Sequence, residues 1–283
     1  MEVNFSAYQS ELSDKDFDRL SQFIYTYYGI KLPLNKKIML QSRLKARLKE
    51  NGIATFKEYC DFVLSGKGGE NEIIHMIDVV STNKTDFYRE AIHFDFMKQV
   101  ALPEMILRHG IQHLKVWSSA CSSGEEPYTL TFVLSEFREQ NPQFDFSILG
   151  TDISTRILEK ARTAIYPTDR VDVVPLAEKK KYLLRSKDQE NPMIRIIPEL
   201  RAKTRYARLN LIDDVYTGIP KDFDLLFCRN VLIYFDRPTQ EKVINKLCTH
   251  LKTGGYFFLG HSESISAMDV PLKQIKPTIF QKI

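Results

Sequence analysis

Cysteine is scarce in this 283-residue sequence, which contains four cysteines and no CxxC pair. Cys60, Cys121, Cys228 and Cys248 are far apart in the chain, so neither a disulfide framework nor a cysteine-based metal cluster is indicated. We therefore expect no metal. Such sparse cysteine usage is typical of proteins in a reducing compartment, so we expect a cytoplasmic protein.

Long apolar runs are also absent. No stretch of about 18 apolar residues occurs, so we expect no membrane insertion. The start of the chain, MEVNFSAYQSELSDKDF, lacks both a basic segment and an apolar segment, so we expect no signal peptide. The net charge of +4 and the pI of about 8.7 are lower than a dedicated nucleic-acid domain would have, and we expect no nucleic-acid partner.

Hydrophobic residues make up 43% of the chain, enough for a sizeable core, and its length suits two domains. Residues 1–90 have the periodicity of amphipathic helices, and three of the predicted helices begin with a residue type that caps helices. These helices are expected from Ser13 to Gly29, from Asn35 to Gly52, from Thr55 to Gly66 and over residues 71–83. We therefore predict an all-α N-terminal domain over 1–90.

Short apolar strands alternate with amphipathic helices in residues 91–283. Strands are expected over 113–120, 144–153, 204–212, 222–235 and 254–262, with one or two edge strands in 274–283. This alternation predicts an α/β domain with a doubly wound, mostly parallel sheet. Residues 166–206 interrupt the pattern, so we expect a small β insertion there, in the form of a hairpin.

The turn after the first predicted strand, WSSACSSGEEPYTL (117–130), is rich in small residues but carries two acids, Glu125 and Glu126. A turn of this kind at a helix N-terminus usually binds a phosphate. A carboxylate there occupies the anion site, which favours a nucleoside with a positively charged tail, such as S-adenosylmethionine. The spacing alone equally fits two ordinary first-turn acids, with Pro127 near the helix start.

Polar residues also follow the other predicted strands. Asp152 ends the second strand, where an acid can accept hydrogen bonds from ribose hydroxyls. Asn210 follows the third strand, and Arg229 and Asn230 follow the fourth. Because ligands of doubly wound sheets bind at the carboxyl ends of the strands, these side chains are expected to meet at one site.

Six motifs in order complete the pattern: STNKTDFYRE (81–90), WSSACSSGEEPYTL (117–130), GTDIS (150–154), LNL (209–211), FCRNVLIYFD (227–236) and GHSES (260–264). In this order the motifs resemble those of the CheR-type chemotaxis receptor methyltransferases, and the resemblance covers nearly the whole chain. The resemblance implies methyl transfer from S-adenosylmethionine to glutamate side chains on cytoplasmic helices of chemoreceptors, with S-adenosylhomocysteine as the product.

The resemblance also implies a set of site residues. The cofactor-binding positions would be Asn83, Thr85, Arg89, one of Glu125 and Glu126, Asp152, Asn210, Leu211, Arg229 and Asn230. Arg89 would suit the methionine carboxylate, and Arg89 and Tyr234 are the candidate catalytic residues. Without the resemblance, Thr85 also fits a helix cap and Tyr234 a core aromatic.

Residues 36–49 carry six basic side chains and no acid. Lys36, Arg43 and Arg47 share one helical stripe, which fits either a solvated face or a docking surface for acidic receptor helices. Family members that tether a receptor's C-terminal peptide have a glycine-rich loop in the insertion. The corresponding loop here, RSKDQENP (185–192), has no glycine, so we expect no tethering.

Three other functions compete with this one. An RNA or small-molecule methyltransferase would share the cofactor, but the basic run lacks the interleaved aromatics of an RNA-binding surface. A catalytically silent receptor-binding or cofactor-sensing protein would keep the fold without the chemistry. A dinucleotide-dependent dehydrogenase is the least favoured, because Glu125 and Glu126 would face the pyrophosphate.

Overall fold

A computed structural model describes residues 10–81 and 83–283. Residues 1–9, which belong to the stretch in which we expect no signal peptide, lie outside that range. The described N-terminal part is all helical, as predicted, with α1 (Asp14–Tyr28), α2 (Lys37–Glu50), α3 (Phe56–Leu64) and α4 (Gly69–Val80). These helices pack around one apolar cluster that includes Leu20, Leu44, Tyr59 and Ile77. No helix in the described ranges is long and apolar enough to cross a bilayer.

Local capping chemistry explains most of these helix ends. The Ser13 side chain accepts the N–H of Asp16, and Gly29 ends α1 with a φ of 69°. Thr55 and Glu58 form a reciprocal capping box at the start of α3. The prediction for Asn35 was wrong, because it lies inside a 3₁₀ turn, Leu34–Lys36, that precedes α2.

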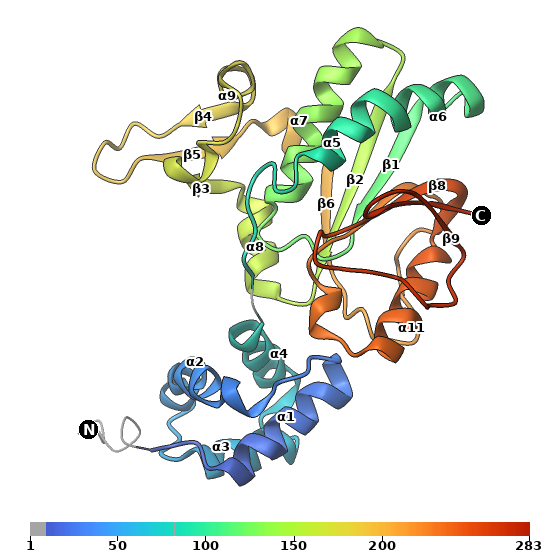
Figure 1. Cartoon of the computed structure of the whole chain (residues 1–283). Coiled ribbons are helices and arrows are strands. Elements are labelled where there is room, and N and C mark those ends of the chain that lie inside the picture. Colours follow the sequence, from blue (N-terminus) through green and yellow to red (C-terminus); the bar gives the residue numbers. More distant parts are fainter. Residues whose placement is uncertain (1–9, 82) are drawn as a thin grey trace.

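The second part contains a seven-stranded sheet, part of which is labelled in Figure 1. Its strand order is β6-β2-β1-β7-β8-β10-β9. Its strands are β1 (His113–Ser118), β2 (Asp145–Asp152), β6 (Thr204–Arg208), β7 (Phe223–Cys228), β8 (Leu251–Leu259), β9 (Leu272–Lys276) and β10 (Ile279–Lys282). The first five pair in parallel, and β10 joins β8 and β9 antiparallel. This confirms the predicted fold class. The strand predicted over 222–235 is shorter than expected, because it ends at Cys228 and a 3₁₀ helix covers Leu232–Tyr234.

Side chains from neighbouring strand positions enter two separate cores. Leu225 and Phe258 lie in the core under α5 (Ile92–Phe96), α6 (Leu102–His109) and α7 (Glu125–Gln140). A π-helix over Met97–Ala101 joins α5 to α6. Leu226 and Phe257 lie in the opposite core, beneath α11 (Arg237–Cys248). Both faces are therefore covered, as a mostly parallel sheet requires.

The insertion forms a separate three-stranded antiparallel sheet, in the order β3-β5-β4, rather than a single hairpin. It contains β3 (Ile165–Pro167), a 3₁₀ helix (Thr168–Val171), α9 (Leu176–Tyr182), β4 (Leu183–Arg185), β5 (Met193–Ile196) and α10 (Pro198–Arg201), and α8 (Thr155–Thr163) leads into it. The end of the range expected for the insertion, 204–206, belongs to β6 of the main sheet. Figure 1 shows the insertion beside α7, projecting away from the sheet.

Candidate active site

A cleft of about 300 Å³ lies at the carboxyl ends of β1, β2 and β7, where the strand order reverses. Three parts of the chain line it: the segment from Tyr28 to Met39, the linker around residues 80–89, and the loops that follow the strands. The predicted cofactor-binding residues that line it are Asn83, Thr85, Arg89, Glu126, Asp152, Asn210, Leu211, Arg229 and Asn230. Tyr234 and Lys36 line it too, so chain topology brings nearly all of the predicted site together.

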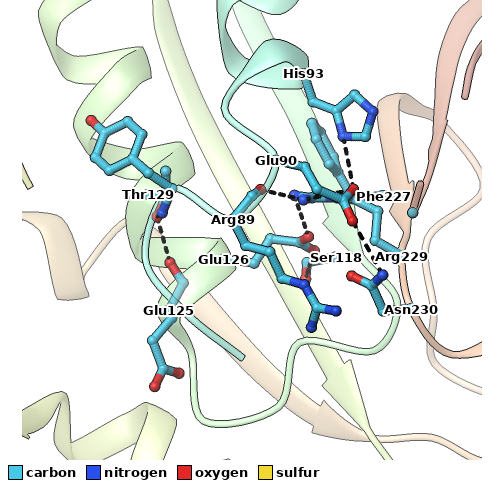
Figure 2. A network of polar contacts seen from close by, with 12 residues as sticks. Arg89, Glu90, His93, Ser118, Glu125, Glu126, Thr129, Phe227, Arg229 and Asn230 are labelled. Atoms are coloured by element: carbon cyan, nitrogen blue, oxygen red, sulfur yellow. Dashed lines mark hydrogen bonds and ion pairs between the residues drawn. The ribbon is translucent and has the colours of Figure 1, made fainter. Parts of the chain in front are cut away.

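The two neighbouring acids of the turn point to different surroundings. Glu126 lines the cleft, accepts a hydrogen bond from Ser118 Oγ at 2.6 Å, and pairs with Arg229 Nη1 at 3.0 Å. Burial raises the pKa of Glu126. Glu125 is not among the lining residues; its carboxylate pairs with Arg170 at 2.9 Å (Figure 2 shows it directed away from the Arg229 network). Of the two acids that the sequence left open, Glu126 is therefore the one that lines the cleft.

Arg229 is the centre of a buried polar network at the end of β7 (Figure 2). Its guanidinium pairs with Glu90 at 3.2 Å as well as with Glu126, and it donates to the Arg89 carbonyl. The same guanidinium lies 5.5 Å from the Phe94 ring centroid. The carboxylates of Glu90 and Glu126 already compensate its charge. Arg229 therefore holds the residues at the base of the cleft in place and is not a free cation for a ligand.

Asp152 both holds the acid-bearing turn and faces the cleft. One carboxylate oxygen accepts the Ser122 N–H at 2.9 Å, and the other accepts the Ser154 N–H at 3.0 Å. Burial raises the pKa of Asp152, although these N–H groups favour its ionised form. Each oxygen keeps a further lone pair, so the carboxylate can still accept hydrogen bonds from a diol such as ribose.

Arg89 lies in the linker between two residues in the left-handed region, Tyr88 at φ 53° and Glu90 at φ 58°. Its Nη1 donates to the Lys84 carbonyl at 3.0 Å, and Figure 2 shows its guanidinium directed away from the Arg229 network. Non-glycine residues with positive φ are uncommon and gather at functional sites. The strained linker therefore fixes a cation at the cleft, where it suits a carboxylate.

The N-terminal domain closes the other side of the cleft. Asn210 Nδ2 donates to the Tyr27 carbonyl at 2.8 Å, and the Lys31 N–H donates to the Tyr234 carbonyl at 3.0 Å. The loops after β6 and β7 are therefore attached to the end of α1 and the segment that follows it. Tyr234 is half-buried and lines the cleft, so it is not simply a core aromatic.

Comparison with known proteins agrees with this geometry. Residues 83–280 match the model of the CheR methyltransferase S-adenosylmethionine-binding domain, and residues 15–81 match that of the CheR all-alpha domain. The chain belongs to the CheR methyltransferase family. Both the resemblance and the expected methyltransferase fold are thereby confirmed.

Curated relatives match over most of their length. A chemotaxis protein methyltransferase of Borreliella burgdorferi is 39% identical over 99% of this chain and 96% of its own length. The chemotaxis protein methyltransferase of Escherichia coli is 36% identical over 91% of this chain and 87% of its own length. Chemotaxis protein methyltransferase 2 of Pseudomonas aeruginosa is 32% identical over 94% and 92%, respectively. Similarity therefore covers both parts of the chain.

The three predicted docking residues do not form one exposed stripe. Lys36 lies in the 3₁₀ turn and lines the cleft, and Arg43 donates to the carbonyls of Val80 and Ser81 at 2.6 and 3.1 Å. Arg47 is only 8% exposed and pairs with Glu72 at 2.5 Å. The prediction was wrong for Arg47, because a buried ion pair uses its charge inside the helical domain.

Glu263 has a positioning role that was not predicted from the sequence. The residue belongs to the GHSES motif (260–264), which was noted only as part of the family resemblance. Its buried carboxylate accepts four backbone N–H groups, those of Asn230, Val231, Leu232 and Gly260, at 2.7–2.9 Å. Burial raises the pKa of Glu263, while these N–H groups lower it. It therefore fixes the loop after β7 that carries Arg229, Asn230 and Tyr234.

Glu90, His93 and His261 are the one group of three metal-ligand side chains found in the described part of the chain, with ligand atoms within 4.8 Å of one another. The Glu90 carboxylate is already shared by Arg229, Asn230 Nδ2 and the His261 N–H. A cation at this place would also lie beside the Arg229 guanidinium. The group is better explained as part of the Arg229 network, and the absence of a metal stays a prediction.

Proposed function

We propose that this protein transfers a methyl group from S-adenosylmethionine to glutamate carboxylates on chemoreceptor cytoplasmic domains, in the cytoplasm. The products are glutamate methyl esters and S-adenosylhomocysteine. The observation that carries the proposal is a cleft at the sheet switch point whose phosphate-type turn presents Glu126, beside Asp152. Two carboxylates would repel a pyrophosphate and suit a cofactor with cationic groups. The relatives are named chemotaxis protein methyltransferases, which supports a protein of the chemotaxis system, here a chemoreceptor, as the substrate.

The lining residues fit the parts of this cofactor. Asp152 suits the ribose hydroxyls, Asn210 and Leu211 the adenine, and Glu126 the ammonium group. Asn83, Thr85 and Arg89 would bind the methionine end, with the Arg89 guanidinium on its carboxylate. Arg229 and Asn230 would support this end through the network around Glu90.

The proposed mechanism asks for positioning rather than for proton transfer. When bound, S-adenosylmethionine supplies an electrophilic methyl group on a sulfonium. A glutamate side chain has an ordinary pKa of about 4.3, so it reaches the cleft as a carboxylate and needs no general base. Arg89 and Tyr234 would orient the reactants, and closure of the cleft by the N-terminal domain would exclude water. Correct orientation alone can contribute about 7–11 kcal/mol to such a reaction.

The substrate would enter between the two domains. We propose residues 1–90 as the substrate-docking domain and 91–283 as the cofactor-binding domain. Lys36 lies at the cleft, and Lys31 and Lys84 also line it, so an acidic receptor helix would meet positive charge there. Because the loop 185–192 has no glycine, we propose that docking uses this surface and not a tethered receptor tail.

Labelled methyl transfer into receptor cytoplasmic fragments tests the proposal. Incubation with methyl-labelled S-adenosylmethionine should label a fragment that contains methylatable glutamates, and mild base should release the label as methanol. A fragment with those glutamates changed to alanine is the control and should stay unlabelled. Base-stable label, or no label in a receptor panel despite cofactor binding, would rule out the proposed reaction.

A further inference from the structure

A single arginine connects the β insertion to the predicted cofactor site. Arg170, in the 3₁₀ helix that follows β3, donates to Asp86 Oδ1 through Nη1 at 2.9 Å. Its Nη2 donates to the Thr85 carbonyl and to Glu125 Oε1, the latter at 2.9 Å. One planar guanidinium therefore joins the insertion, the linker and the first turn of α7.

Glu125 explains why a cation is needed at this position. The residue is 2% exposed, and its second oxygen accepts a hydrogen bond from Ser123 Oγ at 2.7 Å. A buried carboxylate without a cation is costly, and Arg170 supplies that cation to Glu125. The acid that faces away from the cleft thus serves as the anchor for Arg170.

A second contact from the insertion holds the other end of the same linker. The Tyr88 hydroxyl donates to the carboxylate of Glu178 in α9. Thr129 Oγ1 of α7 accepts the Tyr88 N–H at 3.1 Å, and the Thr129 hydroxyl in turn donates to the Glu125 carbonyl. The segment from Thr85 to Tyr88 is therefore held at both ends between the insertion and α7, and Arg89 follows directly.

We propose that Arg170 is a positioning residue that preorganises residues 83–89 for S-adenosylmethionine, so that the insertion is part of the cofactor site. The inference rests on the proposed function, because Asn83, Thr85 and Arg89 are its predicted contacts to the methionine end. A segment that is ordered before binding costs the ligand no ordering entropy, whereas a released segment must be ordered by the ligand itself. Arg170 is absent from the cleft lining, so it would act indirectly, through its contacts to the linker and to Glu125.

Changes at Arg170 test this by separating charge from geometry. Arg170→Ala should raise the Kd for S-adenosylhomocysteine and the KM for S-adenosylmethionine by about tenfold or more, the scale of lost charged hydrogen bonds, with a smaller change in kcat. Arg170→Lys keeps the charge for Glu125 but cannot hold three acceptors in one plane, and should give an intermediate Kd. Arg185→Ala, on an exposed strand of the same insertion, is the matched control and should bind as the wild type does.

Two further measurements distinguish positioning from general damage. Hydrogen exchange of residues 83–89 in the free enzyme should be faster in Arg170→Ala than in the wild type, while that of β1 and β7 stays unchanged. Combining Arg170→Ala with Glu125→Gln should weaken binding less than the sum of the two single changes, since both remove one pair. If Arg170→Ala does not fold, Arg170→Lys and Asp86→Asn provide the same comparison.

Unchanged Kd and unchanged linker exchange in the folded Arg170 variants would overturn the inference. Failure of the wild type to bind S-adenosylhomocysteine would instead reject the proposed cofactor, so the two failures can be told apart.

Discussion

Glu263 holds Asn230 in a left-handed backbone conformation at the end of β7. Its Oε2 accepts the Asn230 N–H at 2.9 Å and the Gly260 N–H at 2.7 Å, and Asn230 has a φ of 59°. A Cβ at Gly260 would lie 2.4 Å from Asn230 Nδ2, so only glycine allows the two loops to approach this closely. The GHSES motif therefore supports the loop that carries Arg229 and Tyr234, although Ser262 and Ser264 are not lining residues of the cleft.

Glu263→Gln should destabilise the protein. An amide group has one oxygen, so two of the four N–H donors would face an NH₂ group and lose their acceptor. Each buried donor without a partner costs about 1–3 kcal/mol, so a clear fall in the free energy of unfolding is expected. Urea unfolding measures it, with Glu199→Gln, a change at an exposed residue of α10, as the control. Equal stability of the two variants would contradict the proposed role of Glu263.

Asp152→Ala should weaken cofactor binding. It removes the carboxylate proposed for the ribose and also releases the Ser122 N–H that shapes the turn. Loss of charged hydrogen bonds on this scale costs about 1–3 kcal/mol, or about 5–150-fold in Kd. Calorimetry with S-adenosylhomocysteine measures the change, and NAD should show no binding to the wild type. Tight NAD binding without any response to S-adenosylhomocysteine would exclude the proposed cofactor.

Cofactor affinity should fall as the pH is lowered. The fall should begin at a higher pH than it would if Glu126 had the pKa of an ordinary glutamate. The ionised form of Glu126 attracts an ammonium group, and the protonated form, which gains population as pH falls, does not. Because burial raises the pKa of Glu126, this loss begins above the usual range near 4.3. Burial also raises the pKa of Asp152, so protonation of this carboxylate should add to the loss of affinity.

Calorimetry between pH 5 and 7.5 can separate the Glu126 contribution. Glu126→Gln should bind S-adenosylhomocysteine more weakly at pH 7.5 and show a smaller further loss at pH 5 than the wild type. The exposed change Glu199→Gln should leave the wild-type profile intact. Identical pH profiles for Glu126→Gln and the wild type would show that this carboxylate does not contact the ammonium group.

The sequence predicts interactions between residues that are close in the chain, such as helix caps. It also predicts that residues at the carboxyl ends of the parallel strands lie at one site. Ser13 and Thr55 cap their helices through contacts three residues away, and Asp152 lies at the cleft because parallel strands end at one edge. The choice between Glu125 and Glu126 was not predictable. It depends on Arg170 and Arg229, which are 45 and 103 residues further along the chain.

The same limit explains the wrong prediction for Arg47 in the basic stripe. Helical spacing correctly places Arg47 near the leucine face of α2, but the partner that buries it, Glu72, is 25 residues away in α4. A run of basic residues therefore predicts an exposed face only where no acid of another helix packs on it.

The basic residues of the N-terminal domain should divide into two classes. Arg47→Ala leaves Glu72 as a buried charge, so it should lower the free energy of unfolding by about 3–5 kcal/mol. Lys36→Ala should leave stability unchanged and raise the KM for receptor, more strongly at low salt, because the screening length is about 10 Å at 0.1 M. Urea unfolding and receptor methylation at two salt concentrations measure both effects. A Lys36 variant with normal receptor KM at low salt would remove this residue from the docking surface.

Receptor tails should contribute nothing to substrate recognition. In the tethering route an extended peptide adds to the edge of the insertion sheet, which here is β4 or β3. The loop after β4 has no glycine between Arg185 and Pro192, so close backbone approach and positive φ are both disfavoured there. A free receptor C-terminal peptide should therefore bind with a Kd weaker than about 1 mM, or about −4 kcal/mol. A receptor without its tail should be methylated as fast as the intact one, whereas micromolar peptide binding that disappears on deletion of residues 185–192 would show that the insertion does hold the tail.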